Sequence, residues 1–103
     1  MARQAVTDED GATVGWFDTR RATRYRDSLE WDGRNWCSTA NGTWHLRETL
    51  YRTAGGCWVL HLYHPEWDWW RYVCDLEAAE WLIRCGYRRE SEELFPDLLE
   101  EPA

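Results

Sequence analysis

The stretch from Thr43 to Tyr63 constrains the fold of this chain more than any other. Residues 43–52 and 57–63 have the length of two β-strands, and the second is rich in β-branched, aromatic and aliphatic side chains. The connection between them is Thr-Ala-Gly-Gly, whose paired glycines permit the positive φ angles of a tight turn. The pattern predicts a central β-hairpin.

Turn signals before this hairpin indicate more strands. Asp32-Gly33 and Asn41-Gly42 are dipeptides typical of tight hairpin turns, and they predict strands over 25–31 and 34–40. Further strands are expected over 14–18 and 69–74, with a loop over 64–68. Residues 19–26 fit either a strand or a single helical turn.

One amphipathic helix is predicted after the last strand. Asp75 is expected to cap it and Gly86 to end it, with an apolar stripe formed by Leu76, Ala79, Leu82 and Ile83. A second, short helix is expected within residues 90–99. The sequence therefore predicts an α+β fold, in which an antiparallel meander of about five strands precedes one amphipathic helix packed on the sheet.

The length of 103 residues and the distribution of charge predict one domain with acidic ends. We expect a flexible acidic lead-in over 1–12, the domain over 13–89 and an acidic tail over 90–103. The net charge is −7, and residues 90–103 hold six acids and no base. Such a tail favours solubility; alternatively, it imitates nucleic acid toward a partner's basic groove, using Glu92, Glu93, Glu100 and Glu101.

A cytoplasmic location is predicted, because the chain shows no signal-peptide pattern and no apolar run near the roughly 18 residues of a membrane span.

Turn lengths set the expected registers. A two-residue Asn-Gly turn places Trp36 opposite Arg47, and a four-residue turn over 53–56 places Tyr51 opposite Trp58 and Glu48 opposite His61. One face then holds Asn35, Cys37, Trp44, Leu46, Glu48, Leu50, Cys57, Val59, His61 and Tyr63, and the other Trp36, His45, Arg47, Thr49, Tyr51, Trp58, Leu60 and Leu62. A two-residue second turn would keep these two faces, whereas a three-residue turn would exchange the faces of the last strand.

Both predicted faces are apolar, and one helix covers only one of them. The other needs the N-terminal strands, a second subunit or a ligand. Because nine tryptophans exceed what so small a core needs, we predict a non-enzymatic module that binds a protein partner through an aromatic sheet face, or forms a homodimer through it. The predicted contact residues are Trp36, Arg47, Tyr51, Trp58, Trp67 and Trp69.

Two other functions remain open. Arg20, Arg21, Arg24 and Arg26 form a basic strip which, with nearby tryptophans, would suit single-stranded nucleic acid, although the net charge disfavours this. Glu48 beside His61 would suit a small enzyme with a carboxylate-oriented base. The simpler interpretation of that pair is a cross-strand polar contact, which we favour.

No metal or other cofactor is predicted. Cys37, Cys57, Cys74 and Cys85 include no closely spaced pair, so buried free thiols are expected. His45 and His61 would lie on opposite faces, which argues against a shared metal.

Several segments together resemble a family of small uncharacterised bacterial proteins associated with plasmid- and phage-type elements. They lie within residues 17–87: Phe17-Asp18, Trp31-Asp32-Gly33-Arg34-Asn35, Leu50-Tyr51-Arg52-Thr53, Gly56-Cys57-Trp58-Val59-Leu60, and Glu77-Ala78-Ala79-Glu80-Trp81-Leu82 before Gly86. The family has no established activity, so the resemblance implies no catalytic residue. It implies an accessory role in a mobile element and, by analogy, an inhibitor of host machinery such as an anti-CRISPR protein.

Overall fold

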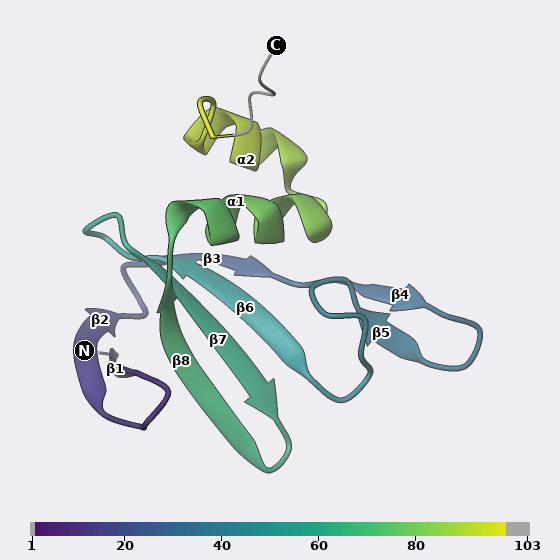
Figure 1. Cartoon of the computed structure of the whole chain (residues 1–103), viewed down its shortest axis with the longest axis horizontal. Helices are drawn as coiled ribbons and strands as arrows, with labels where there is room; N and C mark the ends of the chain where they lie inside the picture. Colours follow the sequence, from purple (N-terminus) through teal and green to yellow (C-terminus); the bar gives the residue numbers. More distant parts are fainter. Residues whose placement is uncertain (1, 99–103) are drawn as a thin grey trace.

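The α+β prediction is confirmed. A computed structural model describes residues 2–98, and within this range the chain forms eight short strands followed by two helices (Figure 1). The strands are β1 (Arg3–Thr7), β2 (Thr13–Asp18), β3 (Thr23–Arg26), β4 (Leu29–Trp31), β5 (Trp36–Ser38), β6 (Arg47–Arg52), β7 (Trp58–His64) and β8 (Trp67–Val73). The helices are α1 (Asp75–Arg84) and α2 (Arg88–Leu94).

A four-stranded antiparallel sheet in the order β3-β6-β7-β8 forms the centre of the fold. Its strands β6 and β7 are the predicted central hairpin, and β8 follows after a turn at Pro65 and Glu66. The sheet is therefore a three-strand meander with β3 added beside β6. Two further pairs, β1-β2 and β4-β5, are separate two-stranded ribbons.

Helix α1 covers one face of the sheet. Leu50 and Leu60, which are opposite each other on β6 and β7, pack in one core with Trp81 and Leu82. The helix is rotated from the predicted orientation, because Leu76 is 48% exposed while Ala78, Ala79, Trp81 and Leu82 are buried. The residue before the helix is Cys74, not Asp75, and it makes no side-chain cap.

The ribbon formed by β1 and β2 covers one end of the other face. Val6 and Phe17 pack on Tyr51 and Val59 of the sheet, and Val6 is fully buried. Residues 1–12, expected to be a loose lead-in, thus contain a strand that contributes to the core. The sequence did not reveal this strand, because only one of the five residues of β1 is a fully buried apolar residue, and one such residue does not make an alternating pattern.

The predicted register of the central hairpin is wrong by one residue. The connection spans residues 53–57, closed by hydrogen bonds between Thr53 N and Cys57 O (2.8 Å) and between Cys57 N and Thr53 Oγ1 (3.0 Å). Leu50 consequently pairs with Leu60 and Tyr51 with Val59. This shift exchanges the two faces of β7, as a one-residue slip must.

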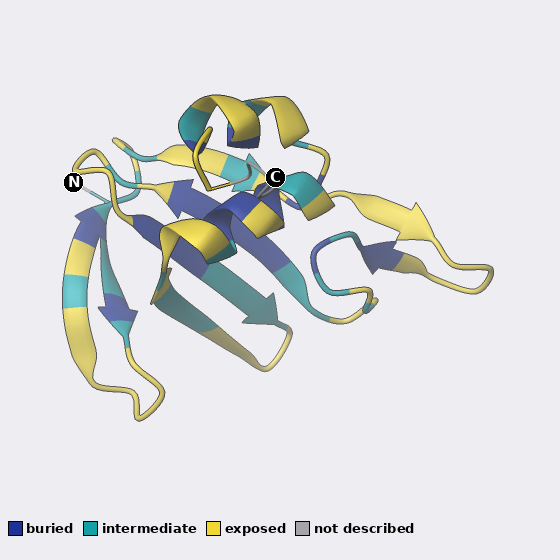
Figure 2. Ribbon diagram, turned by 45° about the horizontal axis from the view of Figure 1, so that its top comes forward, coloured by how far each residue is buried: buried dark blue, intermediate teal, exposed yellow. Residues whose placement is uncertain are grey.

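The predicted pairing of residues 34–40 with 43–52 is also wrong. β5 pairs instead with β4 across the expected Asp32-Gly33 turn, whereas β6 pairs with β3. We call the β4–β5 hairpin, residues 29–38, the arm. It extends away from the sheet and helices, and most of its surface is exposed (Figures 1 and 2).

The predicted acidic tail over 90–103 is partly structured. Residues 88–94 form α2, and Ser91 and Phe95 are buried, Phe95 against the Trp58 ring at 5.4 Å. Helical structure is thus confirmed within the expected short-helix segment.

The burial of Val6 provides a test of this fold. We expect Val6→Ala to lower the free energy of unfolding by roughly 2 kcal/mol, because it removes two buried methyl groups. The matched variant Val14→Ala, at a position that is 54% exposed, should change it by less than about 0.5 kcal/mol. Urea unfolding measures both, and equal effects would contradict the packing of β1 against the sheet.

Candidate functional site

The tryptophans divide into a buried and an exposed group. Trp58 and Trp81 are almost fully buried, and Trp69 and Trp70 are half-buried. The other five are between 49% and 66% exposed: Trp16, Trp31, Trp36, Trp44 and Trp67. Over half of the indoles therefore lie at the surface of the isolated chain.

The arm carries two of the exposed indoles. Trp31 and Trp36 are directly opposite each other on β4 and β5, with ring centroids 5.5 Å apart. Leu29 lies on the same side of the arm by strand alternation and is 45% exposed. Asp32 holds the turn, because its Oδ1 accepts hydrogen bonds from the backbone N–H groups of Arg34 and Asn35.

Four rings form a second aromatic surface, which we call the ring row: Trp44, His45, His64 and Trp67. Neighbouring rings have centroids 5.4, 5.7 and 5.5 Å apart, and the His64 and Trp67 rings are stacked. His64 Nδ1 also accepts a hydrogen bond from Glu66 N. Sequence reasoning missed this cluster, although a two-residue turn at Pro65 and Glu66 would have placed His64 opposite Trp67.

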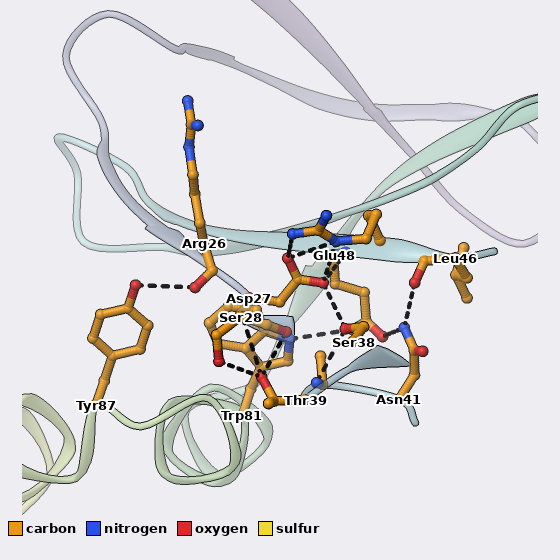
Figure 3. Close-up of polar contacts among 12 residues, drawn as sticks. Arg26, Asp27, Ser28, Ser38, Thr39, Asn41, Leu46, Glu48, Trp81 and Tyr87 are labelled. Atoms are coloured by element: carbon orange, nitrogen blue, oxygen red, sulfur yellow. Dashed lines mark hydrogen bonds and ion pairs between the residues drawn. The ribbon is translucent and has the colours of Figure 1, made fainter. Parts of the chain in front are cut away.

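A buried carboxylate anchors the base of the arm (Figure 3). The Asp27 side chain is fully buried and accepts hydrogen bonds from Arg47 Nη2 (2.6 Å), Ser38 Oγ (2.5 Å) and Glu48 N (3.0 Å). Arg47 Nε adds two further contacts. Since Ser38 belongs to β5 and Glu48 to β6, Asp27 joins the arm to the sheet.

Glu48 continues this network toward the helix. Its Oε1 accepts a hydrogen bond from Trp81 Nε1 (3.1 Å), and its Oε2 accepts one from Asn41 Nδ2 (2.7 Å). The predicted Glu48–His61 pair is wrong, because His61 lies opposite Thr49 and on the other face of the sheet. Glu48 accepts structural hydrogen bonds. It is not placed to orient His61, as the hypothesis of a carboxylate-oriented base requires.

His61 has a different carboxylate partner. Its Nε2 lies 3.1 Å from Asp68 Oδ2, and its ring stacks on Trp70 at a centroid distance of 3.7 Å. Trp70 Nε1 donates to the same carboxylate oxygen. Burial lowers the pKa of His61, and the Asp68 carboxylate partly opposes this effect.

The six predicted contact residues do not form one surface. Trp36 and Trp67 are exposed, and Trp69 is half-buried with its Nε1 bound to Thr7 O. Tyr51 and Trp58 are 7% and 3% exposed, so neither side chain is accessible to a partner in this structure. Trp58 is buried because the register shift places it on the sheet face covered by the helices. Tyr51 is buried because the β1–β2 ribbon packs on it.

Arg47 does not lie opposite Trp36 as predicted, since β5 and β6 are unpaired, and its guanidinium binds Asp27.

The charged candidates on α2 and in the basic strip occupy exposed positions. Glu92 and Glu93 lie on α2, each paired with an arginine one turn earlier, Arg88 and Arg89. Glu100 and Glu101 lie outside the described residues. Arg20, Arg21, Arg24 and Arg26 are all exposed, on β3 or in the segment before it.

Other site types find little support in residues 2–98. No group of three His, Cys, Asp or Glu side chains there is arranged to hold a metal ion. Cys37 and Cys85 are buried free thiols, but Cys57 and Cys74 are exposed, so the prediction of buried thiols is correct for two of the four. Neither α1 nor α2, the two helices in that range, is long and apolar enough to cross a membrane.

Comparison with known proteins adds no assignment: the chain matches no protein-family model, no curated protein and no solved structure.

The burial of His61 predicts how its protonation and the stability of the fold depend on pH. Because burial favours the neutral ring, we expect an NMR titration midpoint below the ordinary 6.5. Asp68→Asn should lower it further, since Asp68 stabilises the charged form. His61 therefore binds a proton more tightly in the unfolded chain than in the folded chain. As a result, the free energy of unfolding of the wild type should fall as pH drops below about 6.5. A midpoint above 6.5 would contradict the assigned burial.

Proposed function

We propose that the protein is a cytoplasmic, non-enzymatic binding module that docks its arm and ring row onto a protein partner. The observation that carries this proposal is the Trp31–Trp36 pair, 53% and 59% exposed on a hairpin that extends from the domain. Docking would act by covering the functional surface of the partner, which is how a small inhibitor works.

The arm would gain stability from a partner. A two-stranded hairpin alone is marginally stable in water, so contact with another surface would stabilise the arm as well as bury its indoles. Tryptophan is also the residue type most enriched among the energetically dominant contacts of protein interfaces. The ring row starts at Trp44, in the segment that connects the arm to β6, and offers a second apolar contact.

A second copy of the chain is the simplest alternative partner. The same arm on two copies would then form a self-complementary interface. The resemblance to plasmid- and phage-associated proteins stays a prediction, and so does the inhibitor role that it suggests.

The proposal can be tested by site-specific photocrosslinking in the cells that produce the protein. A photoreactive phenylalanine derivative replaces Trp36 or Trp67, and the matched control replaces Arg89, whose side chain is 88% exposed on α2. We expect discrete crosslinked protein bands from positions 36 and 67 and none from position 89.

Light scattering of the purified protein distinguishes the two kinds of partner. A dimer whose crosslinks join position 36 of both copies supports self-association. Crosslinks to one other protein support a separate partner. A monomer that crosslinks equally from all three positions, or from none, contradicts the proposal.

A further inference from the structure

The sheet face opposite α1 carries a second, chemically different surface. The β1–β2 ribbon packs on Tyr51 and Val59 at one end of this face. Toward the other end, strand alternation and register place Arg26, Thr49 and His61 in one row, and Arg47 and Tyr63 in the next.

Three guanidinium groups belong to this face. Arg24 and Arg26, two residues apart on β3, are paired with Tyr51 and Thr49 and share their side of the sheet with Arg47. Figure 3 shows the Arg26 side chain extending from the sheet on the side away from the helices, whereas its carbonyl accepts a hydrogen bond from Tyr87 of the helical side. We call Arg24, Arg26 and Arg47 the arginine face.

Two of the three guanidinium groups of the arginine face are not neutralised by an ion pair in residues 2–98, and the one exposed carboxylate beside its rings, that of Asp68 opposite Tyr63, is bonded to His61 and Trp70. Neither Arg24 nor Arg26 has an ion-pair partner in residues 2–98, and the Arg24 guanidinium lies over the Tyr51 ring at 5.8 Å. Arg47 uses Nε and Nη2 on buried Asp27, but its side chain remains 35% exposed. Arg20 and Arg21 precede the same strand and are also exposed without an ion pair in that range.

Aromatic rings adjoin these guanidinium groups. Tyr63 is opposite Arg47, and the Tyr63 and His61 rings are 4.9 Å apart, followed by the His61–Trp70 stack. Guanidinium groups bind phosphate oxygens in a planar, two-point geometry, and rings beside them stack on unpaired bases. An acidic peptide would satisfy the charges but would make no use of the rings.

The geometry points to a binding site for single-stranded nucleic acid on the arginine face. Arg24 and Arg26, about 6.7 Å apart along β3, contact successive phosphates, Arg47 a third, and Tyr63 stacks on a base. This site is separate from the ring row, because His64 and Trp67 alternate onto the opposite face of the sheet. The net charge of −7 opposes long-range attraction, so binding depends on these local contacts and weakens with salt.

Fluorescence anisotropy with a labelled oligodeoxythymidylate tests the site. Three phosphate contacts predict a slope of log affinity against log salt of roughly −2, equivalent to a loss of about 20-fold between about 50 and 200 mM salt. The double variant Arg24→Gln, Arg26→Gln should reduce the slope to roughly −0.7, since one contact remains. The matched double variant Arg88→Gln, Arg89→Gln removes equal charge from α2 and should keep the wild-type slope.

Three results would overturn the inference. The first is absence of oligonucleotide binding by the wild type at about 50 mM salt. The second is an equal loss in the α2 control, and the third is displacement of the oligonucleotide by polyglutamate of equal total charge, which would reveal a generic anion surface. Changing Trp36 and Trp67 to serine should leave oligonucleotide affinity unchanged, so failure of this site and failure of the protein-docking proposal are distinguishable.

Discussion

Two buried carboxylates hold the three parts of this fold together. Asp27 binds Ser38 of the arm and both Arg47 and the backbone of Glu48 in the sheet; Glu48 in turn binds Trp81 of α1. A buried carboxylate is costly unless its oxygens are hydrogen-bonded, and these oxygens have partners from separate segments. Only an arrangement that brings arm, sheet and helix together satisfies both groups, so the network specifies how the arm leaves the domain.

The position of the arm explains why so many indoles face solvent. Both faces of the sheet already have a cover, α1 on one side and the β1–β2 ribbon over one end of the other. The arm extends beyond both covers (Figure 2). Trp31 and Trp36, which it carries, are therefore more than half exposed. The exposed aromatic surface is a consequence of topology, and under the proposed function a protein partner covers it.

The parts of the fold that could be predicted from the sequence are those set by residues close together in the chain. Turn dipeptides, paired glycines and an amphipathic segment indicated the central hairpin, the Asp32-Gly33 turn and α1. The registers were not predictable, because one extra residue in the 53–57 connection exchanges the faces of β7. The pairing of β5 was predicted wrongly because Asn41-Gly42 forms a turn that is not followed by pairing of β5 with β6. In this turn, Gly42 N donates a hydrogen bond to Ser38 O.

The candidate surfaces were harder to predict than the fold. The exposure of Trp36 and Trp67 was expected from the sequence. The burial of Tyr51 and Trp58 was not, because it depends on the packing of the β1–β2 ribbon and on the register of β6 and β7. The Glu48–Trp81 bond joins residues 33 positions apart, which no local pattern indicates. A charged residue between apolar neighbours signals a buried network as readily as a catalytic site, and the sequence alone does not separate the two.

Oxidative footprinting of the individual indoles, in the isolated protein and in extract of the producing cells, tests the central claim most directly. In dilute isolated protein, Trp31, Trp36 and Trp67 should oxidise as fast as exposed Trp16, while Trp58 and Trp81 should be protected. In extract, Trp31, Trp36 and Trp67 should become protected and Trp16 should not. Protection of the arm indoles in the dilute monomer, or unchanged oxidation in extract, would contradict the account.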